Sequence, residues 1–172
     1  KNTNSIIIPT VSSQSREYIP IGFLDSSNLV VAPNQVVYTN ESWILSLLCS
    51  KLHMSWIKVV SGRLKSDYRY SSNLCYNTFP FPSISDNRKQ EMTNCAFNII
   101  EEREKHSDKT LAELYDPDKM PDGLKEAHHQ NDLAVERCYR NNPFESDAER
   151  LKYLFNLYEK MIKEEQSVGT LF

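Results

Sequence analysis

The residues best suited to chemistry lie between Arg63 and Ser71. Arg63, Lys65 and Arg69 carry positive charges that neutralise phosphate, and an arginine also presents a planar fork that fits guanine O6 and N7. Asp67 has a carboxylate able to accept a hydrogen bond from cytosine N4. Hydroxyl groups that could donate to phosphates or base edges belong to Ser66, Tyr68, Tyr70 and Ser71. This mixture favours selective reading of DNA over unspecific coating.

The charge distribution fits an anionic partner at this segment, although the net charge of the chain is −3. Residues 1–80 contain seven Lys/Arg and four Asp/Glu, whereas residues 81–172 contain thirteen and nineteen. Between residues 51 and 80 there are five basic residues and one acid. The alternative interpretation is a surface loop whose arginines pair with acidic side chains of the C-terminal half.

Two other groupings are weaker candidates for chemistry. Cys49 and His53 are four residues apart, a spacing that metals use on a helix, but the sequence offers no second pair of ligands. His128 precedes Asp132 by one helical turn, so a carboxylate could orient the imidazole. No nucleophile motif is near it, and a structural hydrogen bond is favoured. We therefore expect no metal site and no catalytic residue in this chain.

The motifs of several enzyme classes are missing. The chain has four glycines and no two lie within ten residues of each other, so neither a Walker A loop nor a GxGxxG turn is present. No two prolines are adjacent, which removes the proline-pair catalytic loop of amino-methyltransferases. No Asp or Glu stands two residues before a lysine, as PD-(D/E)xK nucleases require. The chain is expected to bind no cofactor by itself.

The elements that position these residues differ between the two halves of the chain. Residues 1–40 contain short apolar runs broken by Pro9, Pro20 and Pro33, a pattern typical of strands. A single buried helix is predicted from Asn40, as its N-cap, to Gly62, as its stop. This helix leads directly into the polar and aromatic segment, which shows no helical periodicity.

The residues after Pro82 are predicted to be helical. An apolar stripe follows a cap at Ser85 or Asp86, and a long helix is expected over residues 121–139. Two further S/T-x-x-E capping pairs are Thr110 with Glu113 and Ser146 with Glu149. The predicted fold class is α+β, with a strand-containing unit at 1–82 and a small all-helical unit at 83–172.

Cysteine usage and hydropathy favour a cytoplasmic protein without a membrane partner. Cys49, Cys75, Cys95 and Cys138 are far apart and form no CxxC pair, so reduced thiols are expected. No segment reaches the roughly 18 consecutive apolar residues that a membrane helix needs.

Five motifs carry a resemblance to a known family. In order they are SSQSREYIPIGFLD, SKLHMSW, SGRLKSDYRYS, YNTFPFP and LYDPDKMPDGLKEAHHQNDLAV. With them the chain resembles the C-terminal part of the MmeI-like family of DNA methyltransferases and bifunctional type II restriction-modification proteins. The resemblance extends from about Ile7 to about Lys163, and the pair GRLKSDYRYS and YNxFPFP is its most specific part.

The resemblance implies a division of labour within a longer protein. Residues 1–82 would be the C-terminal part of a target recognition domain, and residues 83–172 a helical C-terminal domain. The parent would transfer a methyl group from S-adenosylmethionine to adenine N6, using a catalytic domain outside this chain, and some members also cut DNA. The partners implied are double-stranded DNA and the remaining domains of the parent methyltransferase.

The resemblance also assigns roles to individual residues. The family reads bases in and around the segment matching GRLKSDYRYS, so Lys65, Asp67 and Arg69 are expected at base edges. Phosphate contact or structural support is expected of Arg63, Tyr68, Tyr70 and Ser71. Arg16 is a second DNA candidate, with a salt bridge to Glu17 or Asp25 as its alternative.

A second function from another class is a protein-interaction module. In it the acidic helical half docks on another subunit without direct DNA contact, and the basic segment only stabilises that docking. The position of four cations separates the two functions. Clustering of Lys58, Arg63, Lys65 and Arg69 on one open face favours DNA, whereas burial against residues 81–172 favours the module.

Overall fold

The computed structural model describes residues 3–28 and 30–169. Its N-terminal part holds a three-stranded antiparallel sheet in the order β3-β1-β4, built from β1 (Ser5–Ile8), β3 (Gly22–Leu24) and β4 (Gln35–Tyr38). Ile6 stands opposite Phe23 on one side and Val37 on the other. Pro9 ends β1 because it has no N–H to donate to the ladder.

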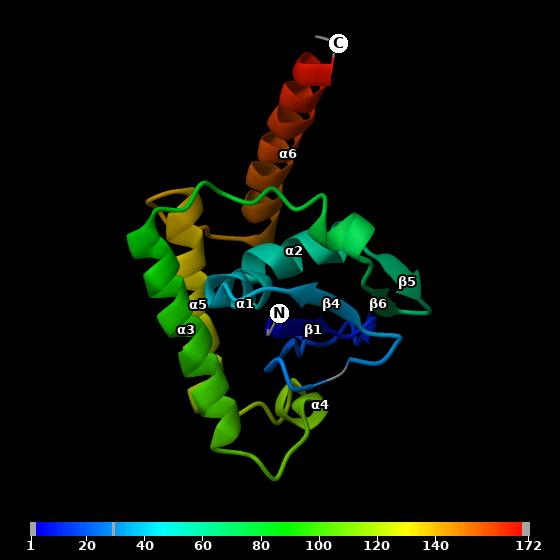
Figure 1. The fold of residues 1–172 in the computed structure, drawn as a ribbon, viewed down its shortest axis with the longest axis vertical. Coiled ribbons are helices and arrows are strands. Elements are labelled where there is room, and N and C mark those ends of the chain that lie inside the picture. Colours follow the sequence, from blue (N-terminus) through cyan, green and yellow to red (C-terminus); the bar gives the residue numbers. More distant parts are fainter. Residues whose placement is uncertain (1–2, 29, 170–172) are drawn as a thin grey trace.

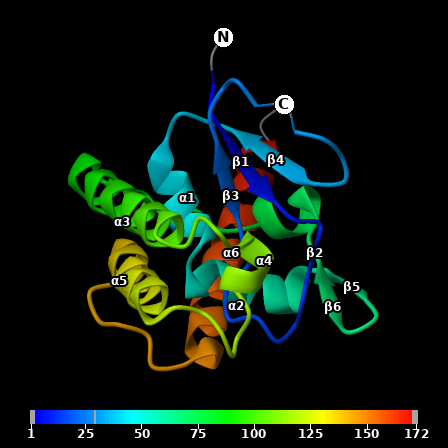
Figure 2. The same cartoon turned by 90° about the horizontal axis from the view of Figure 1, so that it is seen from below.

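A second antiparallel sheet carries the polar segment. Its order is β2-β6-β5, with β2 (Val11–Ser12), β5 (Gly62–Leu64) and β6 (Asp67–Arg69). The short link between β1 and β2 therefore takes the chain from one sheet into the other. In Figures 1 and 2 the β5–β6 hairpin lies on the opposite side of the molecule from two long helices of the second half, α3 (Asp86–Glu104) and α5 (Asp122–Tyr139).

The single helix predicted over residues 40–62 is wrong, because it is divided in two. α1 (Ser42–Leu48) and α2 (Lys51–Val60) meet at a bend of 58°. Ser50 causes the break: its backbone is extended, its hydroxyl accepts from the His53 N–H at 3.2 Å and donates to the Leu47 carbonyl at 2.6 Å. A serine that caps a helix start competes with continued helix.

The ends of this segment also differ from the prediction. The N-cap of α1 is Glu41, one residue after the expected Asn40, and it makes no side-chain capping bond. Ser61 is the C-cap of α2, and Gly62 instead opens β5.

The helical second half is confirmed, and with it the α+β class. It comprises α3 (Asp86–Glu104), α4 (Leu111–Leu114), α5 (Asp122–Tyr139) and α6 (Asp147–Gly169), preceded by a π-helical turn, η1 (Ser72–Tyr76). Ser85 caps α3 by accepting from the Arg88 N–H, as predicted. Figures 1 and 2 show α3 and α5 side by side, with α6 crossing α2 and extending away from the body.

The two predicted capping boxes have different outcomes. At α4 both halves are present, because Thr110 accepts from the Glu113 N–H and Glu113 accepts from the Thr110 N–H. At α6 the Ser146 hydroxyl accepts from the Glu149 N–H at 3.2 Å, but the Glu149 carboxylate accepts from the Glu145 N–H at 2.8 Å. Only half of that box forms, because the carboxylate also binds Arg140.

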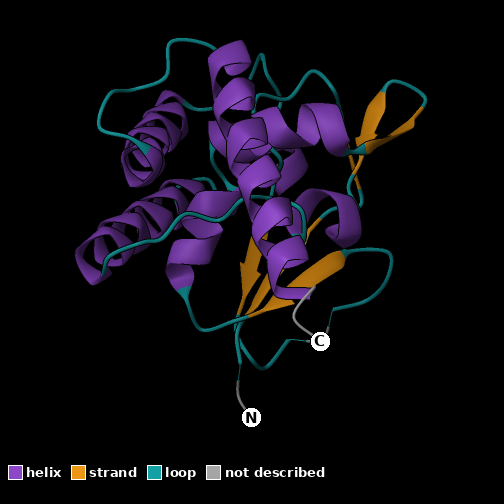
Figure 3. Ribbon diagram, turned by 90° about the horizontal axis from the view of Figure 1, so that it is seen from above, coloured by secondary structure: helices purple, strands orange, loops and turns teal. Residues whose placement is uncertain are grey.

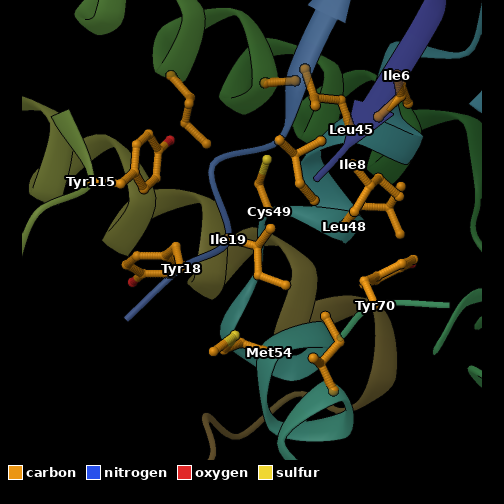
Figure 4. Close-up of a cluster of buried hydrophobic side chains, with 14 of the residues drawn as sticks. Ile6, Ile8, Tyr18, Ile19, Leu45, Leu48, Cys49, Met54, Tyr70 and Tyr115 are labelled. Atoms are coloured by element: carbon orange, nitrogen blue, oxygen red, sulfur yellow. The ribbon is translucent and has the colours of Figure 1, made fainter. Parts of the chain in front are cut away.

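Two hydrophobic clusters form the core, and each draws on both halves of the chain. The larger packs the first sheet on α1, with Ile6 and Leu45 among the side chains drawn in Figure 4, and continues to Ile99 of α3. The smaller surrounds Trp56 and extends to Leu154 of α6. The apolar surface of each half is therefore covered by the other.

A buried arginine, which has no carboxylate partner among the described residues, joins the two halves of the chain. Arg103 of α3 is 8 % exposed, and its guanidinium donates to the Ile21 carbonyl at 2.7 Å and to the Tyr115 hydroxyl at 2.9 Å. It also approaches the Cys49 sulfur at 4.0 Å. These bonds satisfy a cation that would otherwise be costly to bury.

His128 and Asp132 do not form the imidazole–carboxylate pair considered above. His128 Nε2 lies 2.6 Å from the Tyr115 hydroxyl, and its ring stacks on Tyr18 with centroids 4.1 Å apart. Asp132 accepts from the Tyr18 hydroxyl and the Lys51 N–H, each at 2.7 Å. Burial lowers the pKa of His128 to about 3 and raises that of Asp132 to about 7. Both groups hold the two halves together.

The weak metal candidate is also structural. Cys49 lies at the end of α1 and His53 in α2, where its Nε2 is 3.2 Å from the Tyr70 hydroxyl. Within residues 3–28 and 30–169, no group of three His, Cys, Asp or Glu side chains could hold a metal ion. In the same part of the chain no single helix is long and apolar enough to cross a membrane; α1 and α2 meet that test only as a bent pair.

Candidate nucleic-acid interface

The first part of the segment without helical periodicity is a β-hairpin, formed by β5 and β6. Arg63 stands opposite Tyr68 and Leu64 opposite Asp67, so Lys65 and Ser66 form the turn. Lys65 has a φ of 56°, in the left-handed region that glycine adopts most readily. Each strand has only three residues, which is too short for an alternating apolar pattern to be read from the sequence.

Strand alternation separates the candidate residues onto two faces. Asp67 and Arg69 lie on one face of β6, and Tyr68 lies on the other, where it is buried. Arg63 covers the Tyr68 ring, with its guanidinium carbon 4.2 Å from the ring centroid. The same guanidinium donates to the Ser66 carbonyl at 3.1 Å and the Lys58 carbonyl at 3.2 Å. Arg63 and Tyr68 therefore support the hairpin.

The three residues expected at base edges are brought together on the hairpin. Lys65 and Arg69 are exposed, and neither side chain makes a hydrogen bond or ion pair with the part of the chain that the structure describes. Asp67 is half-buried, and its Oδ1 accepts from the Gln14 N–H at 3.3 Å. The cations of Lys65 and Arg69 thus lie on either side of Asp67 along the chain, and the Asp67 carboxylate accepts one hydrogen bond from the described residues.

The Tyr70 side chain belongs to the larger core cluster. It is 2 % exposed, its hydroxyl lies 3.2 Å from His53 Nε2, and burial raises its pKa. The Tyr70 ring points inward beside Ile8 and Leu48 in Figure 4. Ser71 is half-buried, and its carbonyl accepts from the Cys75 N–H at 2.7 Å at the start of η1. Of the two roles expected, the structure gives Tyr70 structural support.

Arg16 is not part of the hairpin site. Its guanidinium donates to the Ala112 carbonyl of α4 at 3.2 Å. The salt bridges considered for it are also absent: Glu17 pairs with Lys51 at 2.8 Å, and the Asp25 carboxylate accepts bonds within its own turn. Arg16 therefore ties the loop before β3 to the helical half.

Of the four cations whose positions distinguish the two functions, one pairs with the helical half of the chain and three do not. Lys58 binds Asp147 of α6 at 2.7 Å, so it pairs with the acidic helical half. Arg63, Lys65 and Arg69 do not, because the hairpin lies away from those helices. Within residues 3–28 and 30–169, the arginines of the hairpin therefore do not form the pairs with the acidic half that the alternative interpretation requires.

A hollow beside the hairpin is lined by Arg69 and by residues that the sequence did not indicate as part of a site. It has a volume of about 490 Å³, and its lining includes Pro9, Val11, Pro33 and Leu64 next to Arg69. Thr10 donates a hydrogen bond to the Pro33 carbonyl and so ties two of its walls together. These residues come from three distant segments, and no local pattern marks them as neighbours.

Comparisons with known proteins agree with this arrangement. The family described as MmeI, target recognition domain, matches residues 1–83, and the family described as MmeI, C-terminal domain, matches residues 84–165. DNA methyltransferase A of Bacillus subtilis (strain 168) is 48% identical over 157 residues, which is 91% of this chain and 18% of that protein.

A solved structure is similar over nearly the whole chain. It is the type IIL restriction-modification enzyme MmeI in complex with DNA, with 37% sequence identity and a TM-score of 0.88. The match covers 94% of this chain and 22% of that one. The chain thus spans about a fifth of each relative. By these matches the chain belongs to the MmeI family of restriction-modification DNA methyltransferases and corresponds to its target recognition and C-terminal domains.

Proposed function

We propose that this chain reads the sequence of duplex DNA for a methyltransferase whose catalytic domain lies outside residues 1–172. The observation that carries the proposal is the projecting β5–β6 hairpin, on which the Lys65 and Arg69 side chains are exposed and have no ion-pair partner among the described residues. Figure 3 draws this hairpin at one corner of the molecule. A protein surface that leaves two neighbouring cations uncompensated is suited to an anionic partner.

The β5–β6 hairpin is a two-stranded antiparallel β-ribbon, an element that the major groove of DNA admits. Arg69 would present its fork to guanine O6 and N7, and Lys65 would approach from the turn. Asp67 is the most selective of the three, because a carboxylate is repelled by phosphate and is tolerated only where it accepts from a base amino group or orients a cation. Arg63 and Tyr68 would hold this face at a fixed angle.

The reaction itself is assigned to the rest of the parent protein. The parent would transfer a methyl group from S-adenosylmethionine to adenine N6, after flipping the base into a pocket of its catalytic domain. This chain would bind duplex DNA and the other parental domains and hold no cofactor. We place it in the cytoplasm, where a DNA-modifying enzyme meets its substrate. Residues 1–82 and 83–172 would act as recognition and helical units.

The test is made in the full-length methyltransferase. Asp67→Ala should relax or shift the modified sequence at one base position, and Arg69→Ala should reduce discrimination at another. A good bidentate contact discriminates by about 1–3 kcal/mol, or about tenfold to a hundredfold. The measurement is sequencing of modified bases after reaction with a random duplex library.

Matched controls lie on the exposed loop before α5. Asp118→Ala and Lys119→Ala remove the same kinds of charge far from the hairpin and should leave the modified sequence unchanged. An unchanged site and unchanged affinity in both Asp67→Ala and Arg69→Ala would show that the hairpin does not read bases.

A further inference from the structure

The hollow beside Arg69 combines exposed apolar side chains with an unpaired cation. Val11 of β2 stands opposite Arg69 in the ladder, so the two side chains share one face of the sheet. Leu64 of β5 stands opposite Asp67 on the same face. Val11 is 39 % exposed and Leu64 is 52 % exposed, and both line the hollow with Arg69.

The ladder also leaves room beside the guanidinium. The residue opposite Arg69 on the β5 side is Gly62, which has no side chain, and a Cβ placed there would have only ordinary contacts at 3.8 Å. Arg69 therefore has an apolar neighbour on one flank and open space on the other. Such a site suits a planar polar group that carries an apolar substituent on one side.

DNA presents this combination at one kind of base. Thymine is the base whose major-groove edge carries a methyl group, and aliphatic side chains contact that methyl in sequence-specific complexes. Arginine pairs with the guanine edge through two parallel hydrogen bonds. A thymine next to a guanine would place its methyl in the hollow while Arg69 binds the guanine.

We propose that Val11 and Leu64 form a subsite for the C5-methyl group of a thymine adjacent to the base read by Arg69. This inference rests on the proposed function, because it requires the hairpin face to enter the major groove. It makes Val11 and Leu64 specificity-determining residues. It also explains why branched apolar side chains stay exposed beside a charged side chain.

The test replaces thymine by deoxyuridine, which removes the methyl group and keeps every hydrogen-bonding atom. Duplexes carrying the recognised sequence are made with each thymine replaced in turn, and their affinity for the full-length enzyme is measured. One replacement should weaken wild-type binding about fourfold, the effect of exposing one buried methyl-sized group. In Val11→Ala and Leu64→Ala the ratio of the affinity for the thymine duplex to that for the uracil duplex should fall toward one.

The control variant is Val59→Ala, which removes the same atoms from an exposed position of α2 outside the hollow. It should keep the wild-type sensitivity to uracil. If Val11→Ala does not fold, Leu64→Ala tests the same subsite from the other strand.

Two results overturn the subsite and leave the proposed function standing: a recognised sequence at which no thymine is sensitive to uracil, or a sensitivity that persists in the folded variants. Absence of any sequence-specific binding by the wild-type enzyme would instead overturn the proposed function.

Discussion

The Arg63 guanidinium lies over the ring of Tyr68, its partner across the β5–β6 ladder, with 4.2 Å between the guanidinium carbon and the ring centroid. The two nitrogens of the same fork donate to the carbonyls of Ser66, in the turn, and Lys58, in α2. One side chain thus connects the tip of the hairpin, its inner face and the helix before it. Arg63 therefore fixes the direction in which Lys65 and Arg69 project.

The first prediction concerns the contacts that Arg63 makes with Tyr68, Ser66 and Lys58. Arg63→Lys keeps the charge but loses the stacked fork and its two carbonyl bonds, so protection of the β5–β6 amides from hydrogen exchange should fall about fivefold to tenfold, or about 1 kcal/mol. Sequence discrimination by the full-length enzyme should weaken as well. If Arg63 is instead a phosphate contact, the lysine variant will bind and discriminate like wild type.

The second prediction concerns the buried Arg103. Arg103→Met keeps most of the side-chain volume but leaves the Ile21 carbonyl without its guanidinium donor and the Tyr115 hydroxyl with His128 as its remaining partner. We expect a loss of about 3 kcal/mol in the free energy of unfolding, since each unsatisfied buried group costs about 1–3 kcal/mol. Urea denaturation measures it.

A double-mutant cycle separates this network from simple loss of packing. Tyr115→Phe removes the hydroxyl that Arg103 and His128 share. The effects of Arg103→Met and Tyr115→Phe should be less than additive by at least about 0.5 kcal/mol. Strictly additive effects would contradict a shared network.

The third prediction concerns pH. Burial raises the pKa of Asp132 from 3.8 to about 7, so the folded chain keeps this proton when the unfolded chain has already lost it. The contribution of Asp132 to stability is therefore complete below about pH 4, falls as the pH rises toward 7, and is level above that. Asp132→Asn should gain stability relative to wild type across this range.

Wild type must be compared with Asp132→Asn because the buried histidines change the pH dependence of stability in the opposite direction. Burial lowers the pKa of His53 and of His128 to about 3. The stability that these histidines contribute to the folded chain therefore falls as the pH drops below about 6.5. The difference between wild type and Asp132→Asn cancels that effect. Unfolding free energies measured from pH 4 to 8 that differ by a constant would show that Asp132 does not titrate in this range.

The fourth prediction concerns the break between α1 and α2. Ser50→Ala removes the hydroxyl that accepts from the His53 N–H and donates to the Leu47 carbonyl. The expected loss is about 1–2 kcal/mol in the free energy of unfolding. Ser50→Thr, which retains a capping hydroxyl, should recover part of it in the same urea titration.

The fifth prediction concerns the two halves. A 1–82 fragment would lose Ile99 and Leu124 from the larger core cluster and Met92 and Leu154 from the smaller one. The apolar surface left exposed should make the fragment insoluble or molten, as seen by dye binding and by loss of a cooperative urea transition. A soluble, monomeric fragment with cooperative unfolding would contradict this.

Local signals in the sequence determined much of this protein. The serine at 85 caps α3 and the Thr110–Glu113 pair caps α4 because a capping bond spans only three residues and needs no other element. Proline-bounded apolar runs similarly marked β1 and β4. The family was recognisable because its motifs are contiguous stretches of sequence, and these stretches also placed Lys65, Asp67 and Arg69 together.

The tertiary structure alone decided which of the candidate side chains are exposed and able to contact a partner. Tyr70 is buried because α2 brings His53 against it. The Arg63 guanidinium is held within the chain because the Tyr68 ring and the Lys58 carbonyl lie beside it. The hollow next to Arg69 exists because strands from distant segments pair there. Long-range contacts of this kind depend on the packing of the whole chain, which no local pattern of residues encodes.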